Sequence, residues 1–189
     1  HRHISHLYCA WPMFETQDDE ALRKACDQAI LNRASENQAS HALGHRALIG
    51  ARLKDSKAVE DSLVNLMNHG IYYDSLLTNH DYDRNSCYCT DFAIGYLGII
   101  NESLVYSYNS EIELLPALPE SFETGEICGI RTRNRCVIDS LKWNIENGTV
   151  TVTIHSEIAQ TLTISCGLSK EKKKIDFKEN ETKIIEFKI

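Results

Sequence analysis

The hydrophobic pattern of this 189-residue chain changes from a helical period to a strand period close to Tyr108. Before that point apolar residues recur every three or four positions, as in helices that bury one stripe. After it, the segment EIELLPALP contains two prolines that exclude a helix, and short alternating runs follow. The pattern therefore predicts an α+β chain with a helical part over residues 1–109 and a β part over residues 110–189.

Four helices are expected in the first part, from apolar residues at helical spacing and acidic or capping residues at their starts. The sequence predicts them over residues 18–35, 40–53, 57–69 and 91–105. The link LKDS between the second and third helices is long enough only for an antiparallel hairpin. Helical hairpins repeated in this way are the units of α/α toroids, in which each pair places one helix inside and one outside.

The second part is expected to hold about seven short strands in an antiparallel sandwich. Asn147-Gly148-Thr149 reads as a hairpin turn between strands near residues 141–145 and 150–155. Further strands are expected near residues 162–166, 174–177 and 183–187.

Charge and hydropathy exclude two classes of partner. The formal net charge is -7 and the pI is about 5.6, with no basic stripe before the run from Lys170 to Lys174, which argues against a nucleic-acid partner. No apolar run approaches the roughly twenty residues that a bilayer-spanning helix needs, so no membrane association is expected.

Seven cysteines are scattered along the chain. An odd number without framework spacing is typical of reduced thiols, so a cytoplasmic location is expected. Cys87 and Cys89 flank a single residue, whereas structural metal sites usually show CxxC pairs with a second pair elsewhere. The sequence therefore predicts neither a metal nor a cofactor.

Asp91 is the carboxylate most suited to chemistry. It lies in the first turn of the fourth expected helix, with Thr90 as a plausible N-cap. Free backbone N–H groups and the positive end of the helix dipole favour an ionised carboxylate there. The alternative is that Asp91 only stabilises the helix start.

Histidines are concentrated in three places. HRHISHLYCAWP holds His3 and Trp11, the second helix carries His41 and His45 four apart on one face, and the polar loop before the fourth helix holds His80. Imidazoles and an aromatic face suit a sugar pocket. The alternatives are rings satisfied by the backbone, a solvated loop and, for His41 and His45, a metal pair that lacks a third ligand and an HExxH pattern.

The order of these segments resembles the carboxy-terminal part of glycoside hydrolase family 95. The resemblance rests on HRHISHLY, an ARL-containing helix, a His-rich loop, an Asp-led helix ending NESLVYS, and EIELLPALPESFETGEICGIRTR, over residues 1 to about 143. It implies part of an (α/α)6 toroid followed by a C-terminal β domain. The family contains α-L-fucosidases, with a few members acting on related sugars.

The resemblance also implies roles for individual residues. The HRHxSHL segment lines the active site in the family, which makes His3 a substrate-contact candidate ahead of His1 and His6. Aligning back from ARL places His41 and His45 where members commonly carry two tryptophans, so a smaller and more polar pocket wall is expected. Asp91 matches the aspartate of an Ile-Asp-Gly-Asn motif whose glycine and asparagine are absent here.

The family is described as inverting, with a glutamate acid and an aspartate that activates a water-holding asparagine. Asp91 matches that aspartate, whereas the acid and the asparagine have no counterpart here. Glu102 is not the acid, since it lies three turns from Asp91, roughly 16 Å along the helix. The chain thus looks like the last part of a longer enzyme, with an N-terminal β domain and earlier toroid helices as its partners.

Three hypotheses follow. The first is part of an inverting hydrolase acting on α-L-fucosides or related sugars, with Asp91 facing a cavity and His3, Trp11, His41, His45 and His80 binding the carbohydrate. The second is a non-catalytic carbohydrate-binding or scaffold protein derived from that fold. The third is another α/α-toroid glycosidase or phosphorylase.

Overall fold

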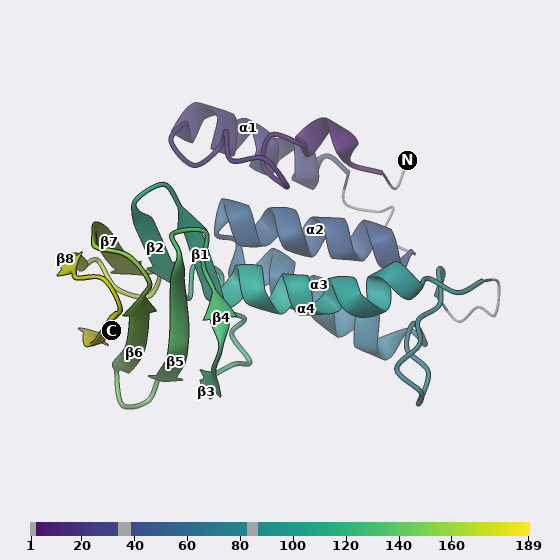
Figure 1. The fold of residues 1–189 in the computed structure, drawn as a ribbon. Helices are drawn as coiled ribbons and strands as arrows, with labels where there is room; N and C mark the ends of the chain where they lie inside the picture. Colours follow the sequence, from purple (N-terminus) through teal and green to yellow (C-terminus); the bar gives the residue numbers. More distant parts are fainter. Residues whose placement is uncertain (1–2, 34–38, 83–86) are drawn as a thin grey trace. The chain divides into compact units, whose positions relative to one another are not determined.

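The computed structural model describes residues 3–33, 39–82 and 87–189 (Figure 1). The chain divides into two compact units, His1–Ser103 and Leu104–Ile189. This division lies before the 109/110 boundary drawn from the sequence. The reason is that Val105–Tyr108 forms strand β1 and pairs with the next strand, instead of extending the preceding helix.

The first unit is helical. A 3-10 turn, η1 (Ser5–Leu7), precedes α1 (Glu20–Leu31), α2 (Ser40–Leu53), α3 (Ser56–Asn68) and α4 (Thr90–Leu104). Asp19 and Asp55 cap α1 and α3, because their side chains accept hydrogen bonds from backbone N–H groups three residues on. Thr90, expected as the N-cap of the fourth helix, is instead its first residue, and Asp91 lies in the first turn as expected.

Helix α2 forms the centre of this unit. Of its fourteen residues all except His41 and His45 are buried. The chain turns back after α2 at Lys54, which adopts a left-handed conformation (φ 64°), so α2 and α3 form the expected hairpin. The two histidines therefore mark the only partly open stretch of an otherwise buried helix.

Helices α2 and α4 run side by side in the same direction (Figure 1). Near their starts His41 contacts Asp91, and near their ends Arg52 binds Glu102. Between these contacts α4 packs closely on α2, since a Cβ placed on Gly44 would lie 2.4 Å from a ring carbon of Phe92. The N-terminal ends of both helices thus lie together, as in neighbouring inner helices of a toroid.

The second unit consists of nine strands in two sheets. They are β1 (Val105–Tyr108), β2 (Glu111–Leu114), β3 (Thr124–Ile127), β4 (Ile130–Arg131), β5 (Cys136–Asn144), β6 (Thr149–Ser156), β7 (Gln160–Cys166), β8 (Lys172–Phe177) and β9 (Glu181–Lys188). One sheet has the order β1-β2-β7-β8; the other has the order β3-β5-β6-β9, with β4 paired to β5. The expected hairpin turn at Asn147–Thr149 joins β5 to β6, with Gly148 at positive φ.

The sheets are mainly antiparallel, as expected, with one exception. Strand β2 pairs with β7 in parallel, with Glu111 opposite Thr163, while every other pairing of the named strands is antiparallel. Burial alternates along β6 and β7, so each strand presents one apolar face to the core and one face to solvent. Within the described ranges, no helix is long and apolar enough to cross a membrane.

Candidate active site

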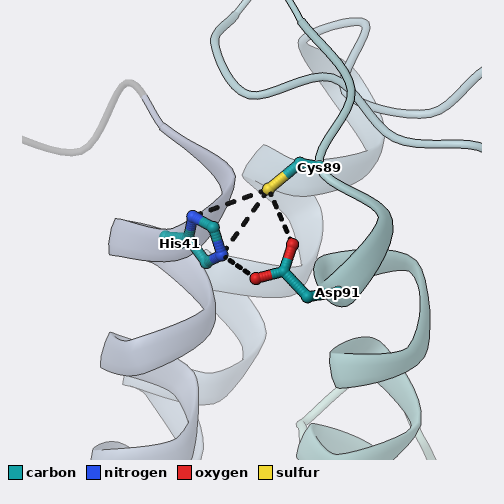
Figure 2. Close-up of side chains that lie close together, drawn as sticks. All are labelled: His41, Cys89 and Asp91. Atoms are coloured by element: carbon teal, nitrogen blue, oxygen red, sulfur yellow. Dashed lines mark hydrogen bonds and ion pairs between the residues drawn. The ribbon is translucent and has the colours of Figure 1, made fainter.

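The candidate site lies at the joined N-terminal ends of α2 and α4. His41 Nε2 is 2.7 Å from Oδ2 of Asp91 (Figure 2). This hydrogen bond holds the pKa of Asp91 below its ordinary value, and the start of α4 favours the same ionised form. His41 therefore donates from Nε2 to a carboxylate.

Cys89 lies against this pair. Its sulfur is 3.5 Å from Nδ1 and 3.6 Å from Nε2 of His41, and 3.5 Å from Oδ1 of Asp91 (Figure 2). The hydroxyl of Ser40 donates to the same sulfur at 3.2 Å. Burial raises the pKa of the Cys89 thiol, so it remains protonated and donates toward Asp91.

Backbone hydrogen bonds from the loop before α4 fix these positions. The Ser40 N–H donates to the carbonyl of His80 at 2.8 Å, and the Cys89 N–H donates to the carbonyl of Thr78 at 2.9 Å. The buried Thr78 hydroxyl in turn donates to the carbonyl of Cys89. The first residues of α2 and the residue before α4 are thus tied to one loop, which sets the spacing of the site.

The candidate carbohydrate-binding residues gather around His41. Its ring centroid is 6.3 Å from that of His45 and 6.0 Å from that of His80, and the Trp11 ring is 6.0 Å from His45. Burial lowers the pKa of His45, and the charges of His41 and His3 lower it further, so His3 also lies within electrostatic reach. Three segments far apart in the sequence therefore meet in one cluster.

The described residues do not enclose Asp91 in the way expected from the sequence. Its side chain is 70% exposed, while that of His41 is 34% exposed. The carboxylate lies beside an imidazole on one side and open to solvent on the other. An enclosed pocket at this point would need further groups opposite Asp91.

The remaining sequence candidates lie apart from this pair or are engaged elsewhere. His6 is exposed in η1, and His1 lies outside the described residues. Asp81 accepts a hydrogen bond from Nδ1 of His80 at 2.9 Å. Glu102, which the sequence does not predict as the general acid, binds the guanidinium of Arg52.

Sequence reasoning missed the part played by Cys89. It weighed Cys87 with Cys89 and His41 with His45 as metal pairs, but the structure instead brings His41, Cys89 and Asp91 together. Their potential ligand atoms all lie within 4.8 Å of one another. His41 and Cys89 are far apart in the sequence, so no local spacing could have revealed this contact.

Comparison with known proteins agrees with the resemblance drawn from the sequence motifs. The model of the glycosyl hydrolase family 95 catalytic domain matches residues 1–104, and that of the glycoside hydrolase family 95 C-terminal domain matches residues 106–189. Alpha-L-fucosidase 2 of Arabidopsis thaliana is 28% identical over 179 residues, covering 89% of this chain. The chain spans 21% of the length of that relative. The resemblance drawn from the sequence is confirmed: the chain belongs to glycoside hydrolase family 95.

Proposed function

We propose that the chain is part of an inverting glycoside hydrolase that acts on α-L-fucosides or related sugars, with Asp91 assisting the catalytic base. The observation that carries this proposal is the His41–Asp91 pair at the paired starts of α2 and α4, surrounded by imidazoles. Family membership supports the hydrolase activity, and the name of the Arabidopsis relative supports the fucoside.

Asp91 can act as the assisting carboxylate because its side chain stays ionised and is accessible to other groups. An inverting reaction needs a base that activates water on the face of the sugar opposite the leaving group. His41 fixes the orientation of Asp91 through Oδ2, and the helix start stabilises the negative charge. The exposed remainder of the carboxylate can then accept a hydrogen bond from a polar group that positions the water.

The imidazoles suit recognition of sugar hydroxyls. His3, His41, His45 and His80 each offer a ring nitrogen as donor or acceptor, and the face of Trp11 offers an apolar surface beside them. Where family members commonly carry two tryptophans, this chain places His41 and His45. We propose that its pocket is therefore more polar. The bound sugar, or the group to which that sugar is linked, then makes more contacts with this wall through its hydroxyl groups.

We further propose that the remainder of a parent chain, an N-terminal β domain and earlier toroid helices, completes the site. Three observations support this. The chain spans about a fifth of the relative, Asp91 is 70% exposed, and α4 exposes Ile94 and Leu97 by 73% and 63%. Ile94 and Leu97 are three apart on α4 and would be covered by neighbouring toroid helices. The general acid would come from those helices.

The test compares the 189-residue chain with the longer protein encoded by its complete reading frame. We expect the longer protein to release fucose from an aryl α-L-fucoside with inversion at the anomeric carbon, seen directly by NMR, and the 189-residue chain to release none. Turnover by the 189-residue chain alone would contradict the proposed division of the site. A retained anomeric configuration, or a requirement for phosphate, would contradict the proposed reaction.

Binding is tested separately by NMR. L-Fucose should shift the imidazole signals of His41, His45 and His80 in the longer protein but leave the signal of His155, in strand β6 of the second unit, unchanged. Equal shifts in all four signals, or none, would contradict binding at this site.

A further inference from the structure

Three side chains of different chemistry converge at the start of α4. His41 offers an imidazole nitrogen, Cys89 a sulfur and Asp91 a carboxylate oxygen, all within 4.8 Å of one another (Figure 2). Thiolate and imidazole ligands favour zinc and related transition metals over magnesium and calcium, which prefer oxygen ligands alone. This combination of nitrogen, sulfur and oxygen ligand atoms therefore favours zinc.

Some of the separations between these atoms equal those of a tetrahedral zinc site. Zinc–sulfur distances of about 2.3 Å and zinc–nitrogen or zinc–oxygen distances of about 2.0 Å give tetrahedron edges of about 3.5 Å between sulfur and the lighter ligands. In the structure the Cys89 sulfur lies 3.6 Å from Nε2 of His41 and 3.5 Å from Oδ1 of Asp91. The sulfur thus already lies at the tetrahedral distance from one ring nitrogen and one carboxylate oxygen. Because it also lies 3.5 Å from Nδ1, the His41 ring must rotate before Nε2 can point at an ion beside the sulfur.

The third edge, between His41 and Asp91, requires the carboxylate to turn so that a single oxygen serves both neighbours, since Oδ1 faces the sulfur and Oδ2 faces the imidazole. Nε2 of His41 and Oδ2 of Asp91 are 2.7 Å apart because a proton lies between them, whereas a shared zinc ion would hold them about 3.3 Å apart. The Asp91 side chain is 70% exposed and can rotate to accommodate this without disturbing packed neighbours.

The surroundings of the three ligands also resemble those of a metal site. Ser40 donates a hydrogen bond to the Cys89 sulfur, the kind of outer contact that orients a metal ligand. Backbone hydrogen bonds with Thr78 fix the main chain of Cys89. The exposed side of Asp91 leaves room for a fourth ligand, either water or the ring of His80, whose centroid is 6.0 Å from that of His41.

We propose that His41, Cys89 and Asp91 form a zinc-binding site with a fourth position open to water or to His80. On binding, the ring proton of His41 passes from Nε2 to Nδ1 through solvent, so that Nε2 can bind the ion, and the thiol proton of Cys89 is released to solvent. The site itself does not depend on the proposed hydrolase activity. If Asp91 also assists the base, then zinc and hydrolysis compete for it, and zinc inhibits the enzyme.

Cobalt(II) is the probe, because it enters zinc sites and its thiolate complexes absorb light through sulfur-to-metal charge transfer. Titrating Co²⁺ into the reduced 189-residue chain should produce this absorption, saturating at one ion per chain and disappearing when Zn²⁺ is added. C89S should abolish the charge-transfer band, and H41Q and D91N should weaken binding at least ten-fold. C87S, two residues away, is the matched control and should bind as the native chain does.

The proposal is overturned if the native chain gives no charge-transfer band, if the band survives in C89S, or if C87S removes it as C89S does. D91N distinguishes loss of a ligand from loss of fold, since it alters an exposed side chain and leaves all seven thiols in place. Unchanged cobalt affinity in a folded D91N variant would also overturn the proposed ligand set. None of these cobalt-binding measurements requires sugar hydrolysis. They therefore test the zinc site independently of the proposed function.

Discussion

Arg52 and Glu102 join the C-terminal ends of α2 and α4 through two hydrogen bonds, from Nε to Oε2 at 2.7 Å and from Nη2 to Oε1 at 3.1 Å. The Arg52 side chain is 1% exposed and that of Glu102 is 13% exposed. The guanidinium also lies over the ring of Phe14, 4.3 Å from its centroid. This ion pair holds the two helices parallel and so keeps His41 and Asp91 together at their other ends.

Removing the Glu102 carboxylate should therefore destabilise the helical unit strongly. E102A leaves the Arg52 charge buried without its carboxylate, which typically costs about 3–5 kcal/mol. Urea unfolding followed by the amide signals of α2 measures the loss. The control is D61A, which removes the partner of Lys57 in an exposed pair on α3 and should cost less than about 1 kcal/mol. Equal losses of stability in the two variants would show that burial of the Arg52–Glu102 pair contributes nothing to the stability of the helical unit.

Asp91→Asn tests the proposed assisting role. In the full-length enzyme it should lower kcat by about 100-fold or more, the range typical of lost acid–base assistance. Stability should change by less than about 1 kcal/mol, because the side chain is 70% exposed. Steady-state kinetics and thermal melting measure both. D61N, an equally simple loss of an exposed carboxylate on α3, should leave kcat unchanged; a D91N enzyme of native kcat would remove Asp91 from the mechanism.

Glycine at position 44 should be needed for the packing of α4 on α2. In G44A the new methyl group would lie 2.4 Å from Cε2 of Phe92, whose buried ring has little free space to move into. Overpacking of this kind costs about 1–3 kcal/mol, against a gain of up to about 1 kcal/mol in helix propensity. We expect a net loss of stability in thermal or urea unfolding.

The matched control for this variant is Gly98→Ala on α4. There the nearest side-chain atom, Cδ2 of Leu48, would be 4.0 Å from the new methyl group, an ordinary contact. G98A should therefore keep the gain in helix propensity and raise stability by up to about 1 kcal/mol. The same sign of change in both variants would argue against the tight contact at Gly44.

The stability of the helical unit should fall in acid because of His45. Its pKa is lowered from the ordinary value of 6.5 by burial and by the charges of His41 and His3. Between that lowered pKa and about 6.5 the unfolded chain binds more protons than the folded chain, so the free energy of unfolding falls as the pH drops through this window. Hydrogen exchange of α2 amides at pH 7.5 and pH 5.5 measures the fall.

H45Q should reduce this pH dependence, since glutamine does not titrate in that range. H155Q, which removes an imidazole from strand β6, should leave it intact. If H45Q kept the full dependence, another group would have to cause it.

Local pattern predicted the helices well. The second helix was expected over residues 40–53, and α2 covers Ser40–Leu53, because apolar spacing and the turn at Lys54 are both local signals. The fold class is confirmed. Strand β1 was missed because Val105 and Tyr106 continue the apolar spacing of α4 and are buried in either conformation. The direction of β2 against β7 was missed because alternation along a strand is the same for parallel and antiparallel partners.

The candidate site was only partly predictable. The sequence alone placed Asp91 in the first turn of a helix and His41 beside His45, since both rest on helical spacing. The contact of Cys89 with His41 depends on the parallel packing of α2 and α4 and on the loop before α4, which is hydrogen-bonded to the start of α2. No residue pattern within either segment encodes that packing.

The parallel pairing of β2 with β7 has a consequence for biosynthesis. A ribosome releases the β1–β2 hairpin first, then the strands β3 to β6 of the other sheet, and only later the strand that covers the free edge of β2. Until β7 emerges, that edge remains available to neighbouring nascent chains. The sheet that contains β1 and β2 therefore cannot be completed until the ribosome has released β7.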